Sequence, residues 1–394
     1  SVSIFAKSED SYGFNISEGT TAGVTIQSAK TSGTAITLDG WSDKSLGLVF
    51  NYNVNKQLLA TGGGDISLKG ITTAYSYGIF LSDIDILASS GTITIDGGSK
   101  GITTGGSKPF AIIGSKIGDP NIASSSSNVH VISDVFNFSS TTKFNTTGSL
   151  TLESAGTSFS NPFNTNNFHL SFTLSGLTIG KQTNISDVTF GTNTTIAGPI
   201  TAYGGTVSIN APLTAESSTI SISATTAASQ TAALTASNLS LNGAGSFALQ
   251  NNLNNIGTLS AGSSSASVGN ISYLDSNELE IGTVGSQSGI FSSGTILVET
   301  DRGNLTLSQN INTTSTSDDA IILNAGKTKT LGTMSGGDII LSGTPTLTFP
   351  STARAKLFSG SALNSTGLTN LVGGDSNVLI NLDETSSLIG KGIT

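Results

Sequence analysis

The feature that most constrains this chain is a short segment of alternating aliphatic and polar residues that recurs along its length. Each segment is entered or left through Gly, Asn, Asp or Ser, residues typical of turns. Because successive side chains of a strand point to opposite faces, each segment predicts a strand with one apolar and one polar face. Examples are Gly23–Ser28, Ala35–Gly40, Asp65–Gly70, Thr92–Gly97, Ser149–Ser154, Gly205–Asn210, Gly294–Glu299 and Asp338–Ser342.

Two all-β architectures accept such a pattern: a sandwich or barrel closed by hairpins, and a parallel β-solenoid whose strands stack on their equivalents one turn, or rung, later. Hairpins favour Asn-Gly or Asp-Gly flanked directly by strands, and one antiparallel domain rarely continues for nearly 400 residues. We therefore expect residues 1–394 to form a single β-solenoid rod with about 20–25 residues per rung.

The composition supports ordered β-structure. Charged residues make up 10% of the 394 residues and Gly contributes 48 positions, yet hydrophobic residues reach 36% and arrive in alternating runs, which argues against disorder. The absence of cysteine excludes disulfides and fits export through a bacterial envelope. The net charge of −9 argues against nucleic-acid binding, and no apolar stretch is long enough to predict a transmembrane segment.

The character of the sequence changes along the chain, which we interpret as three regions of one solenoid. Residues 1–130 are the least regular and hold half of the Lys and Arg residues, residues 131–197 are rich in Phe, and residues 198–394 show the plainest Ser/Thr/Asn-rich rungs. Helical patterns are nearly absent, although 353–368 could form a short helix. We also expect the chain to be a processed or trimmed piece of a longer protein.

Four stretches of the chain are distinctive in wording: Gly176–Lys181, Ile196–Thr214, Thr314–Lys327 and Ala355–Thr369. They resemble filamentous-haemagglutinin-like bacterial surface adhesins of the β-strand-repeat, two-partner-secretion type. The resemblance covers roughly residues 175–394. It implies a right-handed parallel β-helix at the cell surface or released from it, with a role in attachment or cohesion; the usual amino-terminal secretion module is not recognisable.

Carboxylate pairs need attention because β-helices also carry polysaccharide-cleaving enzymes. Asp83 and Asp85 are spaced to share one strand face, as an acid/base pair or a calcium site requires, but we interpret them as a solvated outer face with Ile84 and Ile86 inside. Asp318 and Asp319 are typical of a turn before a strand.

No catalytic constellation emerges from the remaining candidates, so we predict no catalytic, cofactor-binding or metal-binding residues. The scattered bases are His130, His169, Arg302 and Arg354. The nucleophile-elbow match Gly97–Gly101 and the single calcium-turn match Gly373–Asn377 are both interpreted as ordinary turns.

The aromatic residues divide into two groups. We expect the Phe cluster to stack inside successive rungs, because alternation places its rings on the apolar face, with an exposed aromatic platform as the alternative. Trp41, placed in a turn, is the better candidate for an exposed contact. The cluster consists of Phe136, Phe138, Phe144, Phe159, Phe163, Phe168, Phe172 and Phe190.

Polar repeats suggest two further roles. Asn-x-Ser/Thr sequons include Asn137, Asn145, Asn184, Asn238 and Asn304, and such sites could carry glycans, although chance predicts a similar number. Pairs such as Thr92 with Thr94 and Thr346 with Thr348 suggest ice binding, which needs an array flatter than uneven rung lengths predict.

From the sequence we expect a structural or adhesive segment of a secreted bacterial surface protein, not an enzyme, that mediates attachment, cohesion or fibre formation. Its partners would be surface glycans, other cells or further copies of the chain, since unpaired strand edges at uncapped ends can join. A β-helix polysaccharide lyase or hydrolase is the alternative, and ice binding a third.

Overall fold

The computed structural model describes residues 1–16, 23–51, 56–105, 111–114, 124–140, 142–329, 337–360, 364–365 and 367–371. The chain divides into two compact units, Ser1–Gly204 and Gly205–Thr394, and strands dominate both. The expectation that residues 1–394 form one solenoid stays a prediction.

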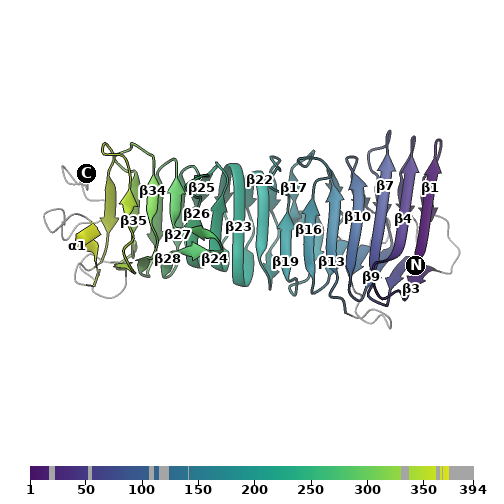
Figure 1. The fold of residues 1–394 in the computed structure, drawn as a ribbon, viewed down its shortest axis with the longest axis horizontal. Coiled ribbons are helices and arrows are strands. Elements are labelled where there is room, and N and C mark those ends of the chain that lie inside the picture. Colours follow the sequence, from purple (N-terminus) through teal and green to yellow (C-terminus); the bar gives the residue numbers. More distant parts are fainter. Residues whose placement is uncertain are drawn as a thin grey trace. The chain divides into compact units, whose positions relative to one another are not determined.

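The first unit is a parallel β-helix with three stacks of strands, and each of the first five rungs adds one strand to each stack (Figure 1). The first stack consists of β1 (Val2–Ser8), β4 (Thr34–Ser42), β7 (Asp65–Thr72), β10 (Thr92–Gly98), β13 (Asn128–Ser133), β16 (Ser149–Glu153), β19 (Gly176–Ile179) and β22 (Ile200–Ile209), whose first residues belong to this unit. The second consists of β2 (Phe14–Ile16), β5 (Leu48–Phe50), β8 (Ile79–Leu81), β11 (Ile102–Thr104) and β14 (Phe136–Asn137). The third consists of β3 (Val24–Ser28), β6 (Lys56–Ala60), β9 (Ile84–Ala88), β12 (Ala111–Gly114), β15 (Thr142–Asn145) and β18 (Phe168–Leu170).

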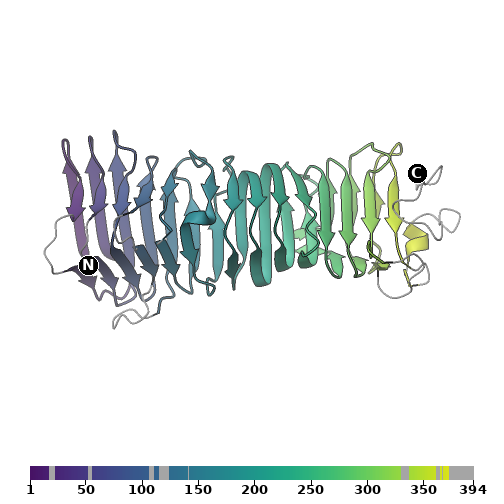
Figure 2. The same ribbon diagram turned by 180° about the vertical axis from the view of Figure 1, so that it is seen from behind.

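Three further short strands and a 3₁₀ turn complete this unit. The strand β17 (Phe163–Asn164) pairs in parallel with β20 (Val188–Phe190), and η1 (Thr165–Asn167) leads from β17 into the third stack. The strand β21 (Thr194–Ile196) follows β20. Seen from behind, the strands keep the same sequential order (Figure 2).

The second unit also stacks its strands in parallel. One stack consists of β23 (Leu213–Gln230), β24 (Leu234–Asn242), β26 (Asn255–Ala261), β28 (Leu279–Ile281), β33 (Leu305–Leu307) and β36 (Ile339–Leu341). From the end of β23 a second runs through β25 (Ser246–Leu249), β27 (Ile271–Asp275), β32 (Ile296–Thr300), β35 (Ile321–Asn324) and β38 (Ala355–Phe358). From the end of β26 a third runs through β31 (Ile290–Ser292), β34 (Ile311–Thr313) and β37 (Leu347–Thr348).

The prediction of an all-β parallel solenoid is confirmed, with two local exceptions. In the described part of the chain, β29 (Thr283–Val284) and β30 (Gln287–Ser288) form an antiparallel hairpin, and Ser263 and Ala266 make an antiparallel bridge. The Gln287 side chain accepts hydrogen bonds from the Ser240 and Ser260 hydroxyls and donates to the Leu241 and Gly262 carbonyls. The hairpin is therefore fastened to the outer face of β24 and β26.

Rung length varies more than we expected. In the first stack the register steps by 34 residues from Ser3 to Thr37 but by 21 from His130 to Thr151. In the second unit it steps by 21 from Leu213 to Leu234 and by 34 from Leu305 to Ile339. Turns absorb these differences, because the ladder of backbone hydrogen bonds fixes the register of each strand independently of the loop that precedes it.

The core is a column of aliphatic side chains along each stack. In the first stack, inward positions of neighbouring strands are directly paired and fully buried. Their apolar contact with the rung before and after supplies the main driving force for stacking. This column contains Leu38, Leu68, Ile95, Val131, Leu152 and Ile179.

The Phe cluster fills the interior of the later rungs of the first unit, as predicted. Its rings meet at centroid distances of 5.4 to 5.9 Å, mostly edge to face, which is the preferred geometry of aromatic pairs. Phe190 is also buried. The prediction is wrong for Phe172, which is 73% exposed in the turn after β18. Rings in mutual contact are Phe136, Phe138, Phe144, Phe159, Phe163 and Phe168.

The predicted short helix is wrong over most of its described part. Within 353–368, Ala355–Phe358 forms strand β38, which pairs with β35 because its apolar positions continue that stack. The α-helix that the structure describes there, α1 (Leu368–Leu371), is a single turn.

Candidate functional site: the outer face of the first stack

The outward positions of the first stack form straight rows of side chains along the first unit. Residues paired in the ladder lie directly beside one another, about 4.8 Å apart, so each outward position generates a row perpendicular to the strands. One row consists almost entirely of hydroxyl residues, and we call it the hydroxyl row. Its members, in rung order, are Ser3, Thr37, Ser67, Thr94, His130, Thr151, Thr178 and Thr201.

A second row, which we call the charged row, lies two residues further along each strand. Lys69 Nζ lies 3.9 Å from Asp96 Oδ2 on the next rung. The His130 Nε2 atom, from the hydroxyl row, lies 3.1 Å from Glu153 Oε1 in the charged row. In rung order the charged row contains Phe5, Asp39, Lys69, Asp96, Ile132 and Glu153.

The interpretation of the basic residues as scattered is therefore wrong for His130. It stands next to a carboxylate because the register places the two residues on adjacent strands, which their separation in sequence hides. His169 is exposed opposite Lys143 on a different stack. In the second unit, Arg302 pairs with neighbouring Asp301 at 3.3 Å, while Arg354 lies just before β38.

The next row, two residues beyond the charged row on the first three rungs, consists of Lys7, Trp41 and Ile71, and we call it the aromatic edge after Trp41. Trp41 pairs with Lys7 on one side and with Ile71 on the other, and Lys7 Nζ lies 4.1 Å from the centre of the Trp41 ring. Trp41 is 39% exposed and Phe5 70%, which confirms Trp41 as an exposed residue. Its expected position in a turn is wrong, because Trp41 belongs to strand β4.

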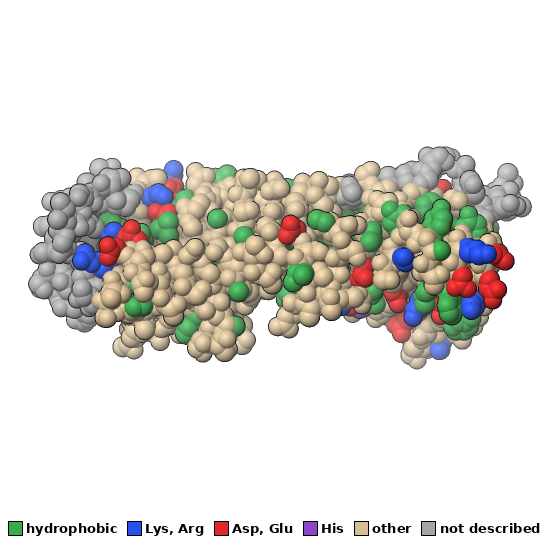
Figure 3. All heavy atoms as spheres, turned by 90° about the horizontal axis from the view of Figure 1, so that it is seen from above, with side chains coloured by type: hydrophobic (Ala, Val, Ile, Leu, Met, Phe, Trp, Pro, Cys, Tyr) green, Lys and Arg blue, Asp and Glu red, His purple; other side chains and the backbone are tan. Residues whose placement is uncertain are grey.

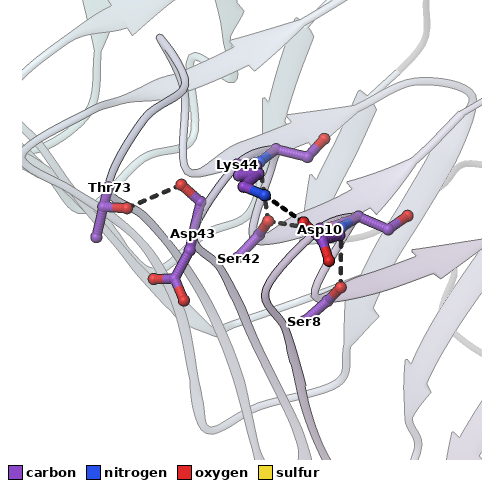
Figure 4. A network of polar contacts seen from close by, with 8 residues as sticks. Ser8, Asp10, Ser42, Asp43, Lys44 and Thr73 are labelled. Atoms are coloured by element: carbon purple, nitrogen blue, oxygen red, sulfur yellow. Dashed lines mark hydrogen bonds and ion pairs between the residues drawn. The ribbon is translucent and has the colours of Figure 1, made fainter.

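The turns that follow this edge form a ladder of hydroxyl groups (Figure 4). Ser8 and Ser42 each accept a hydrogen bond from a backbone N–H three residues on, and Ser42 also donates to the Ser11 carbonyl of the preceding rung. Lys44 pairs with Asp10, and Thr73 donates to the Asp43 carbonyl. These contacts tie each turn to the one before it and so fix the corner beside Trp41.

Glycine lets this corner close. A Cβ on Gly40 would lie 2.1 Å from the Gly47 carbonyl oxygen, and one on Gly70 would lie 2.3 Å from the Gly78 oxygen. No side chain fits at those distances. Gly40, the residue before Trp41, is thus required for the close approach of the two backbone segments at this corner, which positions the aromatic edge.

Figure 3 shows one face of the molecule, on which charged and hydrophobic side chains gather over the first rungs. Among the residues that the structure describes, most of the exposed large hydrophobic side chains belong to rungs one to three of the first unit: Phe5, Tyr12, Trp41, Ile71 and Tyr75. Single exposed apolar residues are common on proteins, whereas a gathering of them marks a contact surface.

The Asp83/Asp85 pair does not form the solvated face that we expected. Ile84 and Ile86 are inside, as predicted, but Asp85 is only 6% exposed, and Gln57 donates to it at 3.3 Å. Asp83 adopts a left-handed backbone conformation (φ 51°) ahead of β9, so it falls outside the strand alternation that the prediction assumed.

A buried lysine, Lys56, lies close to Asp83. The Lys56 side chain is 1% exposed and donates to the Ser82 carbonyl at 3.3 Å. Burial lowers the pKa of the Lys56 amine, and the neighbouring Asp83 carboxylate opposes that shift. Alternation placed Lys56 on the inner face, a position that sequence reasoning passed over.

The other sequence candidates are turns or lie outside the described residues. Gly97–Gly101 crosses a turn between β10 and β11, and Asp318 and Asp319 occupy the turn before β35, both as predicted. Gly373–Asn377 lies outside the described residues. Among the sequons, Asn184 is fully buried and bonded to Tyr203 and Ser186 carbonyls, so it is not available for glycosylation.

In the second unit a phenol and a carboxylate share the interior. Tyr273 and Asp275 are both fully buried, and the Tyr273 hydroxyl donates to Asp275 Oδ2 at 2.7 Å. The Ile256 and Asn277 N–H groups also donate to the carboxylate. Burial raises the pKa of Asp275 despite these hydrogen bonds, and burial together with the carboxylate raises the pKa of Tyr273.

This pair predicts a pH dependence of stability. Folded protein holds the Asp275 proton to higher pH than unfolded chain, so the group's contribution is largest at acid pH and declines as the pH rises from about 4 through the raised pKa. The stability advantage of wild type over Asp275→Asn, measured by urea unfolding, should shrink between pH 4 and 7. Asp318→Asn, in an exposed turn, is the control; a gap that widens with pH would contradict the assignment.

Neither a metal cluster nor a membrane span is found in the described residues. There, no three His, Cys, Asp or Glu side chains gather closely enough to hold a metal ion. Likewise, none of the described helices has the length and apolar character needed to cross a bilayer. Compared with protein families, curated proteins and solved structures, the chain shows no match.

Proposed function

We propose that this chain is a structural and adhesive β-solenoid segment of a secreted bacterial surface protein, in which stacked rungs display lateral faces for attachment, cohesion or fibre formation. One observation carries the proposal. The outward side chains of unequal rungs align into the hydroxyl row, the charged row and the aromatic edge on a single sheet face. Such rows offer many weak contacts to one extended partner, and their combined effect is strong attachment.

A β-helix carbohydrase remains the second candidate, because the same face brings His130 to Glu153 and Lys69 to Asp96. Asp96 and Glu153 are separated by the intervening strand β13, so their Cα atoms lie about 9.6 Å apart at the usual strand spacing. Glycosidase carboxyl groups lie about 5 to 9.5 Å apart, so this backbone spacing alone does not bring the two groups together as such a pair. Each carboxylate also lies within 4 Å of a basic side chain, which suits a binding surface better than a free acid.

A single assay separates the two functions. The purified protein is incubated with beads carrying either a neutral or an acidic polysaccharide, and both bead retention and release of reducing or unsaturated sugar ends are measured. We expect retention without release. Release that is lost in Glu153→Gln would establish the carbohydrase instead, and absence of retention on every surface, including whole cells, would contradict adhesion.

A further inference from the structure

We propose that the outer face of the first stack binds an extended neutral glycan that runs along the solenoid axis over the charged row, with about one sugar per rung. This inference rests on the adhesive function proposed above and assigns its ligand and its site. The evidence is the spacing of the rows, their charge and the aromatic edge.

Spacing favours a linear ligand along the axis. The rise per sugar in an extended β-linked glycan is close to the distance between adjacent strands, about 4.8 Å. Successive sugars therefore lie over successive rungs, and in a β-1,4-linked chain, whose neighbouring sugars are turned by about half a turn, every second sugar presents the same edge to this face. Neighbouring rows lie two residues apart along a strand, about 6.7 Å, which leaves a sugar ring over the charged row flanked by hydroxyls on one side. On the first three rungs Lys7, Trp41 and Ile71 flank it on the other side.

The chemistry of the rows favours hydroxyl groups as the partner. Thr37, Ser67 and Thr94 present donors and acceptors at every rung, and the charged row alternates Asp39, Lys69 and Asp96. Sugar hydroxyls can both donate to carboxylates and accept from ammonium groups. A row in which carboxylates and an ammonium group alternate can therefore hydrogen-bond to the hydroxyl groups of one glycan chain along its length.

The local charge favours a neutral glycan over an acidic one. Asp39, Asp96 and Glu153 outnumber Lys7 and Lys69 on this face when His130 is neutral. An acidic polysaccharide would meet an excess of like charge, which disfavours its binding. The same excess disfavours nucleic acid.

The aromatic edge supplies an apolar contact where the rows begin. Trp41 is held between Lys7 and Ile71, so it loses little side-chain freedom on binding, and Phe5 rises from the charged row itself. The C–H faces of sugar rings pack on such surfaces, and an ordered aromatic gains more from this contact than a mobile one.

The test is calorimetric titration with cello-oligosaccharides of two to six sugars as neutral probes and oligogalacturonates as acidic ones. We expect affinity for the neutral series to rise with length and to exceed that for the acidic series. Trp41→Ala should weaken binding about tenfold, a loss of about 1.4 kcal/mol. Thr94→Arg, which places a bulky cation in the hydroxyl row, should also weaken it, and Phe172→Ala, an exposed aromatic outside this face, should not.

Thermal melts establish that each variant is folded, which is expected because Trp41 and Thr94 point outward. Preferential binding of the acidic series, or equal losses in Phe172→Ala and Trp41→Ala, overturns the site. If the protein does not bind neutral oligosaccharides but still attaches to whole cells, the assignment of a neutral glycan as the ligand is overturned, and the result points to a protein partner. Loss of attachment as well would overturn the adhesive function with it.

Discussion

Asn254→Asp is expected to lower the free energy of unfolding of the second unit by about 3–5 kcal/mol, although it changes one amide into a carboxylate of the same shape. Asn254 is fully buried, and its Nδ2 donates to the Leu274 and Leu249 carbonyls while its Oδ1 accepts from the Leu234 N–H and from Gln230. A carboxylate would face two carbonyl oxygens with no proton to offer and would bury a charge.

The measurement is a thermal melt at neutral pH, in which a loss of this size corresponds to a drop in Tm on the order of 10 °C. Asn255→Asp is the matched control, because Asn255 is the next residue, is exposed, and accepts a hydrogen bond from Asn277 that a carboxylate can also accept. Equal effects of the two substitutions would contradict the assignment of Asn254 as a buried amide that hydrogen-bonds to neighbouring rungs.

Leu68→Asp is expected to destabilise the first unit by more than about 4 kcal/mol. Leu68 is fully buried between Leu38 and Ile95, so an aspartate there removes apolar contacts with two rungs and places a carboxylate in the aliphatic column. Because a solenoid is held by interfaces between neighbouring rungs, the damage should spread from this rung to both neighbours.

Ser67→Asp provides the control, since it places the same residue one position earlier on the same strand, facing outward. It should change stability by no more than about 0.5 kcal/mol. Urea unfolding followed by circular dichroism measures both variants. A destabilising Ser67→Asp beside a tolerated Leu68→Asp would reverse the assignment of inner and outer faces.

The alternation of aliphatic and polar residues was sufficient to predict most of the fold. In Asp65–Gly70 it assigned Ile66 and Leu68 to the core, and the aliphatic pattern implied that each strand stacks on the next. Buried and exposed Phe residues were less separable, because Phe172 follows the same local alternation as Phe168 but lies in a turn. A position belongs to a strand only if its backbone is hydrogen-bonded to the neighbouring rung. The last paired residue therefore depends on that rung and not on the local sequence.

The candidate site was less accessible to sequence reasoning because it depends on register between rungs of unequal length. His130 and Glu153 are 23 positions apart, and Lys69 and Asp96 are 27 apart, with no shared motif to link them. The argument that uneven rungs would misalign the hydroxyl residues failed for the same reason, since turns absorb the difference. A usable signal was present: Thr or Ser sits between two inward aliphatic residues in most of these strands.

Distances between spin labels along the hydroxyl row test the parallel in-register stack most directly. The chain has no cysteine, so cysteines introduced in pairs give clean labelling. Thr37 and Thr151 are four strand spacings apart and Thr37 and Thr201 six, which predicts label separations near 19 and 29 Å at about 4.8 Å per strand. Separations that grow in this proportion support the account; a Thr37–Thr201 distance equal to or shorter than the Thr37–Thr151 distance would contradict it.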